Sequence, residues 1–271
     1  MQLRDATPDD HAIYLRLFPR LAVDDPPLDR ARFVSDLLPS VWIAVGDAGD
    51  TLAYVYAQLL EDTCYVRHLV VDAAHEGRGV GRAVMEAVRA RAKARGLATW
   101  RLSVKPENVR AIALYTACGM RETSRAHALR LVGWPRVAPL VDDVGARARV
   151  VVRDARAEED AELERAYGLA KGQLAAARAM DDRALVVAHE GDARVAFAVF
   201  SAGFPGAYPF RARDLAATDA LVAALAARVD AAPEGRAYFQ LVVEDDEALA
   251  RALLARGAVH VLEVIVMKGA L

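Results

Sequence analysis

The same order of local sequence patterns occurs twice along the chain, and this internal repeat constrains the fold more than any other feature. Each copy begins with a short apolar strand and an acidic helix start, continues with a glycine turn before a longer apolar strand, and closes with a strand, a helix and a glycine. The matching segments are residues 3–6 and 152–155, 49–56 and 191–199, and 100–119 and 238–257. The repeat predicts two copies of one fold.

The length agrees with two domains. A chain of 271 residues is near the size at which one core splits, so two domains of about 135 residues are expected. We place the first at 1–132 and the second at 149–271, with a linker rich in proline and glycine at 133–148. The element order predicts an α/β fold of the mixed α+β kind, with helices flanking a mixed sheet. In the first domain, strands are expected at 41–45, 51–60, 64–71, 99–104 and 120–131, a helical region at 9–38, and helices at 80–95 and 107–117.

Composition excludes several classes of protein. The formal net charge is −2, which gives no general attraction to nucleic acid. No apolar run approaches the roughly 20 residues of a membrane helix. The first residues do not resemble a secretory or transit peptide, so we expect a cytoplasmic protein without a membrane partner. Cys64 and Cys118 lack CxxC spacing, which argues against a metal site.

A glycine-rich loop is the strongest chemical signal. An apolar strand leads through a short loop to Gly77, Gly79 and Gly81, which open the helix expected at 80–95. Without Cβ atoms, glycines let backbone N–H groups converge on an anion at a helix N-terminus. Residues 76–95 also contain six basic side chains against two acidic ones. A P-loop is excluded because no lysine follows Gly81, and a dinucleotide fold is disfavoured because this loop follows the fourth strand.

Two motifs then occur in order. The first is Glu76-Gly77-Arg78-Gly79-Val80-Gly81, and the second runs from Asn108 through Ala111 and Tyr115 to Gly119. With these motifs the chain resembles the GNAT superfamily of acyl-CoA-dependent N-acyltransferases, whose signature is Q/R-x-x-G-x-G/A and then N-x-x-A-x-x-x-Y-x-x-x-G. The resemblance covers residues 1–132 and, more weakly, 149–271. It implies two GNAT-like domains, each a central mixed, mostly antiparallel sheet flanked by helices.

The resemblance implies acetyl-CoA as the co-substrate. The strand edge would pair with the pantetheine, the loop amides would bind the diphosphate, and Asn108 would brace the cofactor. Tyr115 would be the general acid, because a phenol with a pKa near 10 is protonated at pH 7 and can serve the departing thiolate. The implied cofactor-binding residues are Leu69, Val70, Val71, Glu76, Gly77, Arg78, Gly79, Val80, Gly81, Arg82, Asn108 and Tyr115.

Glu76 departs from the glutamine or arginine of the signature. A carboxylate beside a diphosphate is electrostatically unfavourable. We therefore expect the side chain of Glu76 to turn outward while Arg78 and Arg82 help the backbone amides to bind.

The acceptor side carries weaker signals. An amine must lose a proton before it attacks a thioester, and the candidate bases are Glu61, Asp62, His68 and His75. Many GNAT members have a glutamate on the fourth strand where this chain has Arg67, which could instead bind a carboxylate of the acceptor. Strand alternation predicts that only one of Arg67 and His68 faces the substrate, and a structural role for His68 is the alternative. The expected reaction is direct transfer of an acetyl group to a primary amine of a small molecule or a peptide.

The second copy lacks this chemistry. When the helix ends are aligned, Leu253 takes the place of Tyr115 and Asp246 that of Asn108. The connection at 201–214 has no G-x-G before the next helix, and its prolines withhold amide donors. We expect a degenerate, non-catalytic GNAT-like domain that shapes the acceptor cleft or forms an interface such as that of a homodimer. The alternative functions of the whole chain are a non-catalytic acyl-CoA-binding module and an interaction scaffold.

Overall fold

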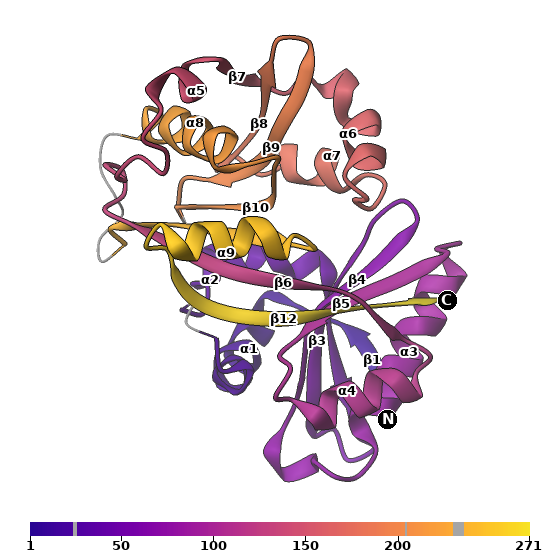
Figure 1. Ribbon diagram of the computed structural model, residues 1–271. Helices are drawn as coiled ribbons and strands as arrows, with labels where there is room; N and C mark the ends of the chain where they lie inside the picture. Colours follow the sequence, from indigo (N-terminus) through magenta and orange to yellow (C-terminus); the bar gives the residue numbers. More distant parts are fainter. Residues whose placement is uncertain (24–25, 204, 230–235) are drawn as a thin grey trace. The chain divides into compact units, whose positions relative to one another are not determined.

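The computed structural model describes residues 1–23, 26–203, 205–229 and 236–271 (Figure 1). The chain forms two compact units: Met1–Thr123 together with Val266–Leu271, and Ser124–Ile265. Each unit is a mixed, mostly antiparallel sheet flanked by helices, which confirms the predicted fold class. Residues 133–148, where a linker is predicted, fall within the second unit and include helix α5 (Val144–Ala148). In the described parts of the chain, no helix combines the length and the apolarity needed to cross a membrane.

The two parallel strands in the sheet of the first unit pair over only part of their length. The order of the sheet is β1 (Gln2–Asp5), β2 (Val41–Val45), β3 (Thr51–Leu59), β4 (Thr63–Val71) and β5 (Thr99–Val104), followed by the last residues of β12 (Val259–Ala270). The parallel pairs of β4 and β5 run from Thr63–Thr99 to Val66–Leu102, whereas β4 continues to Val71. The end of β4 therefore has a backbone edge that extends beyond this ladder.

Helices cover both faces of this sheet. On one face, Tyr14 of α1 (His11–Leu17) packs against Tyr54 of β3 with 5.8 Å between ring centroids. On the other face lies α3 (Val80–Ala94), which buries Val84, Met85 and Val88. These residues recur at helical spacing, and Glu86 between them is exposed. Helix α4 (Val109–Ala117) follows β5 and precedes β6 (Arg121–Val132), as predicted.

The helical region predicted at 9–38 is not continuous. It consists of short pieces: η1 (Pro8–Asp10), α1, η2 (Phe18–Leu21), α2 (Arg30–Arg32), η3 (Phe33–Leu37) and η4 (Leu38–Ser40). Prolines at 19, 26, 27 and 39 explain the breaks, because proline cannot donate the backbone hydrogen bond of a helix interior. Asp24 and Asp25 lie outside the described residues.

The second unit repeats the element order of the first. Its sheet has the order β6, β11 (Tyr238–Glu244), β10 (Gly206–Ala212), β9 (Ala193–Ser201), β8 (Arg183–Glu190) and β7 (Val150–Asp154), with β10 and β11 parallel. Its further helices are α6 (Asp160–Ala166), α7 (Gln173–Arg178), α8 (Leu215–Ala226) and α9 (Glu247–Ala255).

The connection at 201–214 contains a strand of the sheet, β10. Ala207 and Phe210 of this strand are buried. Pro209 lies where the register of β10 shifts, a position at which a strand tolerates a missing N–H donor. Phe204 lies outside the described residues.

Candidate active site

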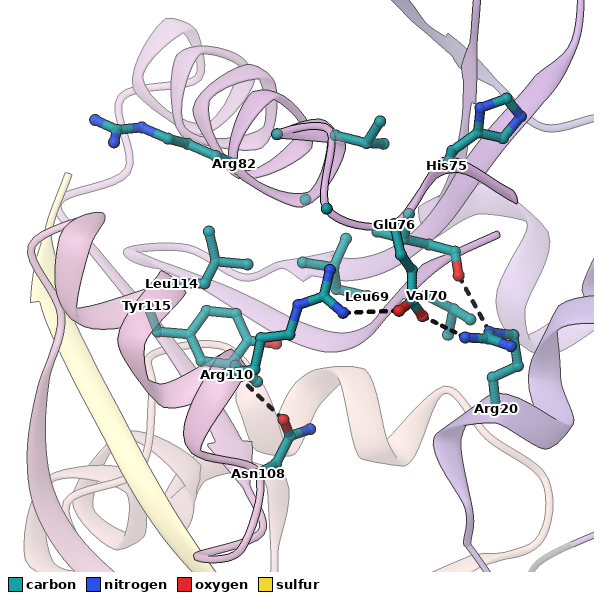
Figure 2. A pocket seen from close by; sticks show the side chains of 16 residues that line it. Arg20, Leu69, Val70, His75, Glu76, Arg82, Asn108, Arg110, Leu114 and Tyr115 are labelled. Atoms are coloured by element: carbon teal, nitrogen blue, oxygen red, sulfur yellow. Dashed lines mark hydrogen bonds and ion pairs between the residues drawn. The ribbon is translucent and has the colours of Figure 1, made fainter. Parts of the chain in front are cut away.

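A cavity of about 420 Å³ lies in the first unit beside the end of β4 (Figure 2). It brings together the strand end, the glycine-rich loop and α4. Eleven of the twelve predicted cofactor residues line it; the exception is Arg78, which is exposed. The other lining residues are Arg20, His75, Arg110, Ala111 and Leu114. Arg20 could not be found from the motifs, because it lies far from them in the sequence and no local pattern marks it.

The loop leaves the start of α3 open toward this cavity. Gly79 is the N-cap of α3 at φ +79° and makes no side-chain cap. The first N–H groups of a helix have no acceptor within the helix, and the helix dipole favours an anion there. A Cβ atom at Gly81 would lie 3.2 Å from Cδ2 of Leu114 and 3.7 Å from Cγ2 of Val71. The glycines therefore keep both the required backbone conformation and the space in front of the amides.

Tyr115 is held in the wall of the cavity by α4. The residue is 9% exposed, and in Figure 2 its hydroxyl end points toward the cavity. Burial, with a smaller contribution from Cys118, raises the pKa of Tyr115 to about 12. The phenol therefore keeps its proton throughout the physiological pH range and can act as a hydrogen-bond donor.

Asn108 has a structural role in addition to lining the cavity. It is the N-cap of α4, and its Oδ1 accepts a hydrogen bond of 3.1 Å from the backbone N–H of Ala111. Asn108, Ala111 and Tyr115 all line the cavity, as their predicted common helix face requires. The cap uses the side-chain oxygen Oδ1 of Asn108, so the side-chain nitrogen Nδ2 is the atom that can donate a hydrogen bond to a ligand.

Glu76 does not turn outward as expected. Its carboxylate lines the cavity and bridges two arginines: Oε1 accepts from Nη2 of Arg20 and Oε2 accepts from Nη1 of Arg110 at 2.7 Å (Figure 2). Hydrogen bonds from Arg110 and then Arg20 lower the pKa of Glu76, so the group is ionised at neutral pH. Two nearby cations explain why the carboxylate stays at the cavity rather than facing solvent alone.

A β-bulge overturns the alternation expected at Arg67 and His68. His68 pairs with Tyr56 and Val66 pairs with Ala57, so Arg67 is an extra residue in β4. Arg67 lies over the ring of Tyr65, with 3.5 Å from its guanidinium carbon to the ring centroid. Because of the bulge, Arg67 and His68 are both on the face that carries Tyr56 rather than on opposite faces.

Residues 9–120 match the acetyltransferase (GNAT) family. This stretch of the chain is therefore similar to the GNAT acetyltransferases. The matched residues contain the glycine-rich loop, Asn108 and Tyr115, and include every residue that lines the cavity.

Known relatives act on different amines. The aminoglycoside N(6')-acetyltransferase type 1 of Stenotrophomonas maltophilia is 29% identical over 142 residues, which are 48% of this chain and 92% of the relative. The [ribosomal protein bS18]-alanine N-acetyltransferase of Escherichia coli (strain K12) is 33% identical over 76 residues, which are 28% of this chain and 51% of that enzyme. A solved GCN5-related N-acetyltransferase from Sphaerobacter thermophilus has a TM-score of 0.65 at 15% identity, covering 99% of this chain and 95% of that one. The last similarity extends the GNAT fold to both units.

The candidate bases lie in different surroundings. Glu61 is exposed in the turn before β4, about 25 Å along the strand from Leu69, and is not part of the cavity wall. His75 lines the cavity, and its Nε2 lies 3.3 Å from Oδ2 of Asp50. His68 lies among aromatic rings, with Nδ1 3.3 Å from the hydroxyl of Tyr54. Among the residues described, no group of three or more histidine, cysteine, aspartate or glutamate side chains could hold a metal ion.

Burial keeps His68 neutral. Desolvation, followed by the charge of Arg67, lowers the pKa of His68 to about 4. In the unfolded chain this imidazole takes up a proton near pH 6.5, so between pH 6.5 and 4 the unfolded state binds more protons than the folded state. The free energy of unfolding should therefore decrease as the pH is lowered from 6.5 to 4, by about 3 kcal/mol from this group.

The variant His68→Gln tests this linkage. Urea unfolding at pH 4.5 and pH 7 should show a smaller loss of stability in His68→Gln than in the wild type. His127→Gln is the matched control, because it removes a histidine of the second unit that is hydrogen-bonded to Glu247 at 2.7 Å. An equal pH dependence in wild type and His68→Gln would show that His68 is not buried in its neutral form.

The second unit differs at the position that corresponds to the glycine loop. The N-cap of α8 is Asp214, whose Oδ1 accepts a hydrogen bond of 2.9 Å from the N–H of Ala217. Asp246 caps α9 as Asn108 caps α4, accepting from Leu249 at 2.9 Å, and Leu253 is fully buried. A carboxylate thus stands at the helix start that is open in α3.

Proposed function

We propose that the first unit transfers an acetyl group from acetyl-CoA to a primary amine by direct attack. The observation that carries this proposal is one cavity with an uncapped helix start, the end of β4 and the buried hydroxyl of Tyr115. The thioester supplies the activated acetyl group. A carbon–nitrogen bond forms, the carbon–sulfur bond breaks, and no side chain needs to act as a nucleophile.

The residues of the cavity fit the cofactor. The diphosphate would lie at the N–H groups of residues 77–82, where any Cβ at Gly81 would already contact Leu114 and Val71. The pantetheine would follow the edge of β4 at Leu69–Val71, which continues beyond its ladder with β5. The amide nitrogen of Asn108 would bind the cofactor while the oxygen holds α4.

Tyr115 would stabilise the departing sulfur of coenzyme A. A phenol with a pKa of about 12 is a weaker acid than an ordinary thiol of about 8.5. It would therefore stabilise the developing thiolate mainly by donating a hydrogen bond rather than by giving up its proton completely. Hydrogen bonds directed at charge that develops in the transition state lower the barrier most.

The amine requires no strong base in this proposal. His68 is unprotonated at neutral pH, but a conjugate acid with a pKa of about 4 holds a proton weakly. Its contacts with Phe18, Tyr54 and Tyr56 support a positioning role instead. We propose that the amine loses one proton to solvent and attacks in the neutral form. The nitrogen gives up a second proton to solvent when the amide forms, and the departing thiolate takes up a proton from solvent, so that the products are the acetylated amine and free thiol.

The acceptor class is a primary amine, as in the named activities of the two relatives. The second unit would not bind a further acetyl-CoA, because the carboxylate of Asp214 already accepts from the first amides of α8. In this proposal the second unit shapes the acceptor side or forms an interface.

Release of free thiol tests the proposed reaction. The protein is mixed with acetyl-CoA and a panel of amines that includes an aminoglycoside, polyamines, amino acids and a peptide with an N-terminal alanine. At least one amine should give thiol and acetylated product above the rate of acetyl-CoA alone. Binding of acetyl-CoA without thiol release for any amine would instead support a non-catalytic acyl-CoA-binding module, and no binding would support a scaffold.

A further inference from the structure

Three charged side chains meet at the wall of the cofactor cavity. Two of them, those of Arg20 and Arg110, are not specified by either motif. Arg20 comes from η2, Glu76 begins the glycine-rich loop, and Arg110 lies in the first turn of α4. Glu76 is bonded to both arginines, and Nε of Arg20 donates a further hydrogen bond of 3.2 Å to the carbonyl oxygen of Val71 (Figure 2). The group joins three separate segments of the first unit.

The charges of this group favour an anion despite the carboxylate. Two guanidinium groups and one carboxylate have a net charge of +1, and Arg82 also lines the cavity. An ionised Glu76 alone at the start of the loop would repel a diphosphate. Bridged by two arginines, it instead keeps both cations at the cavity when no other anion is present.

We infer that Arg20 and Arg110 bind a phosphate group of coenzyme A, and that Glu76 is their internal counterion, which the phosphate replaces. This inference rests on the proposed function, because it assigns side-chain ligands for the same cofactor. Arginine suits the role, since its planar fork donates two hydrogen bonds to phosphate as readily as to carboxylate.

Exchange of partners requires only side-chain motion. The side chain of Arg110 is 65% exposed, and those of Arg20 and Glu76 are each 37% exposed. Arg110 can therefore turn toward a phosphate without moving α4. Arg20 is anchored by the carbonyl oxygen of Val71, which would keep its guanidinium at the cavity after Glu76 leaves. The diphosphate as a whole and the 3'-phosphate each carry more negative charge than one carboxylate, so the arginines gain from the exchange.

Calorimetric titration with coenzyme A tests the assignment without any turnover. Arg110→Gln should weaken binding about ten-fold because a charge-assisted contact is lost. Glu76→Gln should tighten binding about five-fold, since it removes a negative charge close to the phosphates. Arg95→Gln is the matched control: it also removes one positive charge, but at an exposed position about 20 Å away at the far end of α3, and it should stay within about two-fold of wild type.

The possible results separate this inference from the proposed function. No heat with the wild-type protein would overturn the proposed function, and the inference with it. Wild-type binding with Arg110→Gln equal to Arg95→Gln would overturn the inference alone. Weaker binding by Glu76→Gln would overturn the counterion role, because it would mean that the carboxylate helps the bound state.

Two further measurements show which phosphate of coenzyme A is bound and whether a loss of binding reflects misfolding. If the arginines bind the 3'-phosphate, Arg110→Gln should have no effect on the binding of 3'-dephospho-coenzyme A; if they bind the diphosphate, it should weaken both ligands equally. Arg20→Lys keeps the charge but not the fork, and should weaken binding less than Arg20→Gln. Equal affinity of Arg20→Lys, Arg20→Gln and wild type would contradict the assignment of Arg20.

Discussion

Tyr115→Phe should lower kcat by about 100-fold or more while the affinity for acetyl-CoA stays within about two-fold of wild type. The change removes only the hydroxyl and leaves the ring that fills the wall of the cavity between α4 and β4. The hydrogen bond to the developing thiolate exists chiefly in the transition state, so its loss acts on kcat more than on binding. Initial rates of thiol release with saturating acceptor, together with calorimetry, measure both quantities.

The dependence of the wild-type kcat on pH tests the protonation of Tyr115 separately. With its pKa raised to about 12, the hydroxyl stays protonated at pH 10, so loss of its proton should cause no fall in kcat up to that pH. Tyr238→Phe is the control, because Tyr238 lies in the second unit, where its ring packs against Arg130. A Tyr115→Phe variant as fast as Tyr238→Phe would remove Tyr115 from the acid role.

Gly79→Asp should weaken acetyl-CoA binding by about 100-fold. Gly79 is the N-cap of α3, and aspartate there would place a carboxylate at the open helix start. The carboxylate would compete for the first amides and repel the diphosphate. Aspartate is also among the side chains that best tolerate the φ of +79° found at Gly79, which limits the effect on folding.

Gly79→Asn separates charge from size. Asparagine has nearly the same shape and backbone preference but no charge, so we expect a loss of only about ten-fold. Thermal unfolding of both variants shows whether the loop still folds. If Gly79→Asp binds acetyl-CoA as well as wild type, the start of α3 does not hold the diphosphate.

The repeated element order and the glycine-rich loop could be predicted because both depend on local sequence. Apolar periodicity marked β2, β3, β4 and α3, and glycine spacing marked the open start of α3. The spacing of Asn108, Ala111 and Tyr115 placed all three on one face of α4, and all three line the cavity. In each case the pattern and the structural contact lie within one element or two neighbouring ones.

Contacts between distant segments could not be predicted in the same way. The position of Glu76 depends on Arg20 and Arg110, which are separated from it by long stretches of sequence. Arg20 lies outside both motifs, and Arg110 occupies a position that the second motif leaves unspecified. The bulge at Arg67 depends on the register between β3 and β4, which alternation alone does not determine. The domain boundaries have the same limit: Val266–Leu271 belongs to the first unit, although the sequence places these residues at the end of the second copy.

The stoichiometry of acetyl-CoA binding tests the central claim most directly. Titration of the full chain by calorimetry should give one molecule per chain, because the start of α3 is open whereas Asp214 caps the start of α8. A measured ratio of one that is lost in Gly79→Asp is the predicted result. A ratio of zero would contradict the cofactor site, and a ratio of two would contradict its restriction to the first unit.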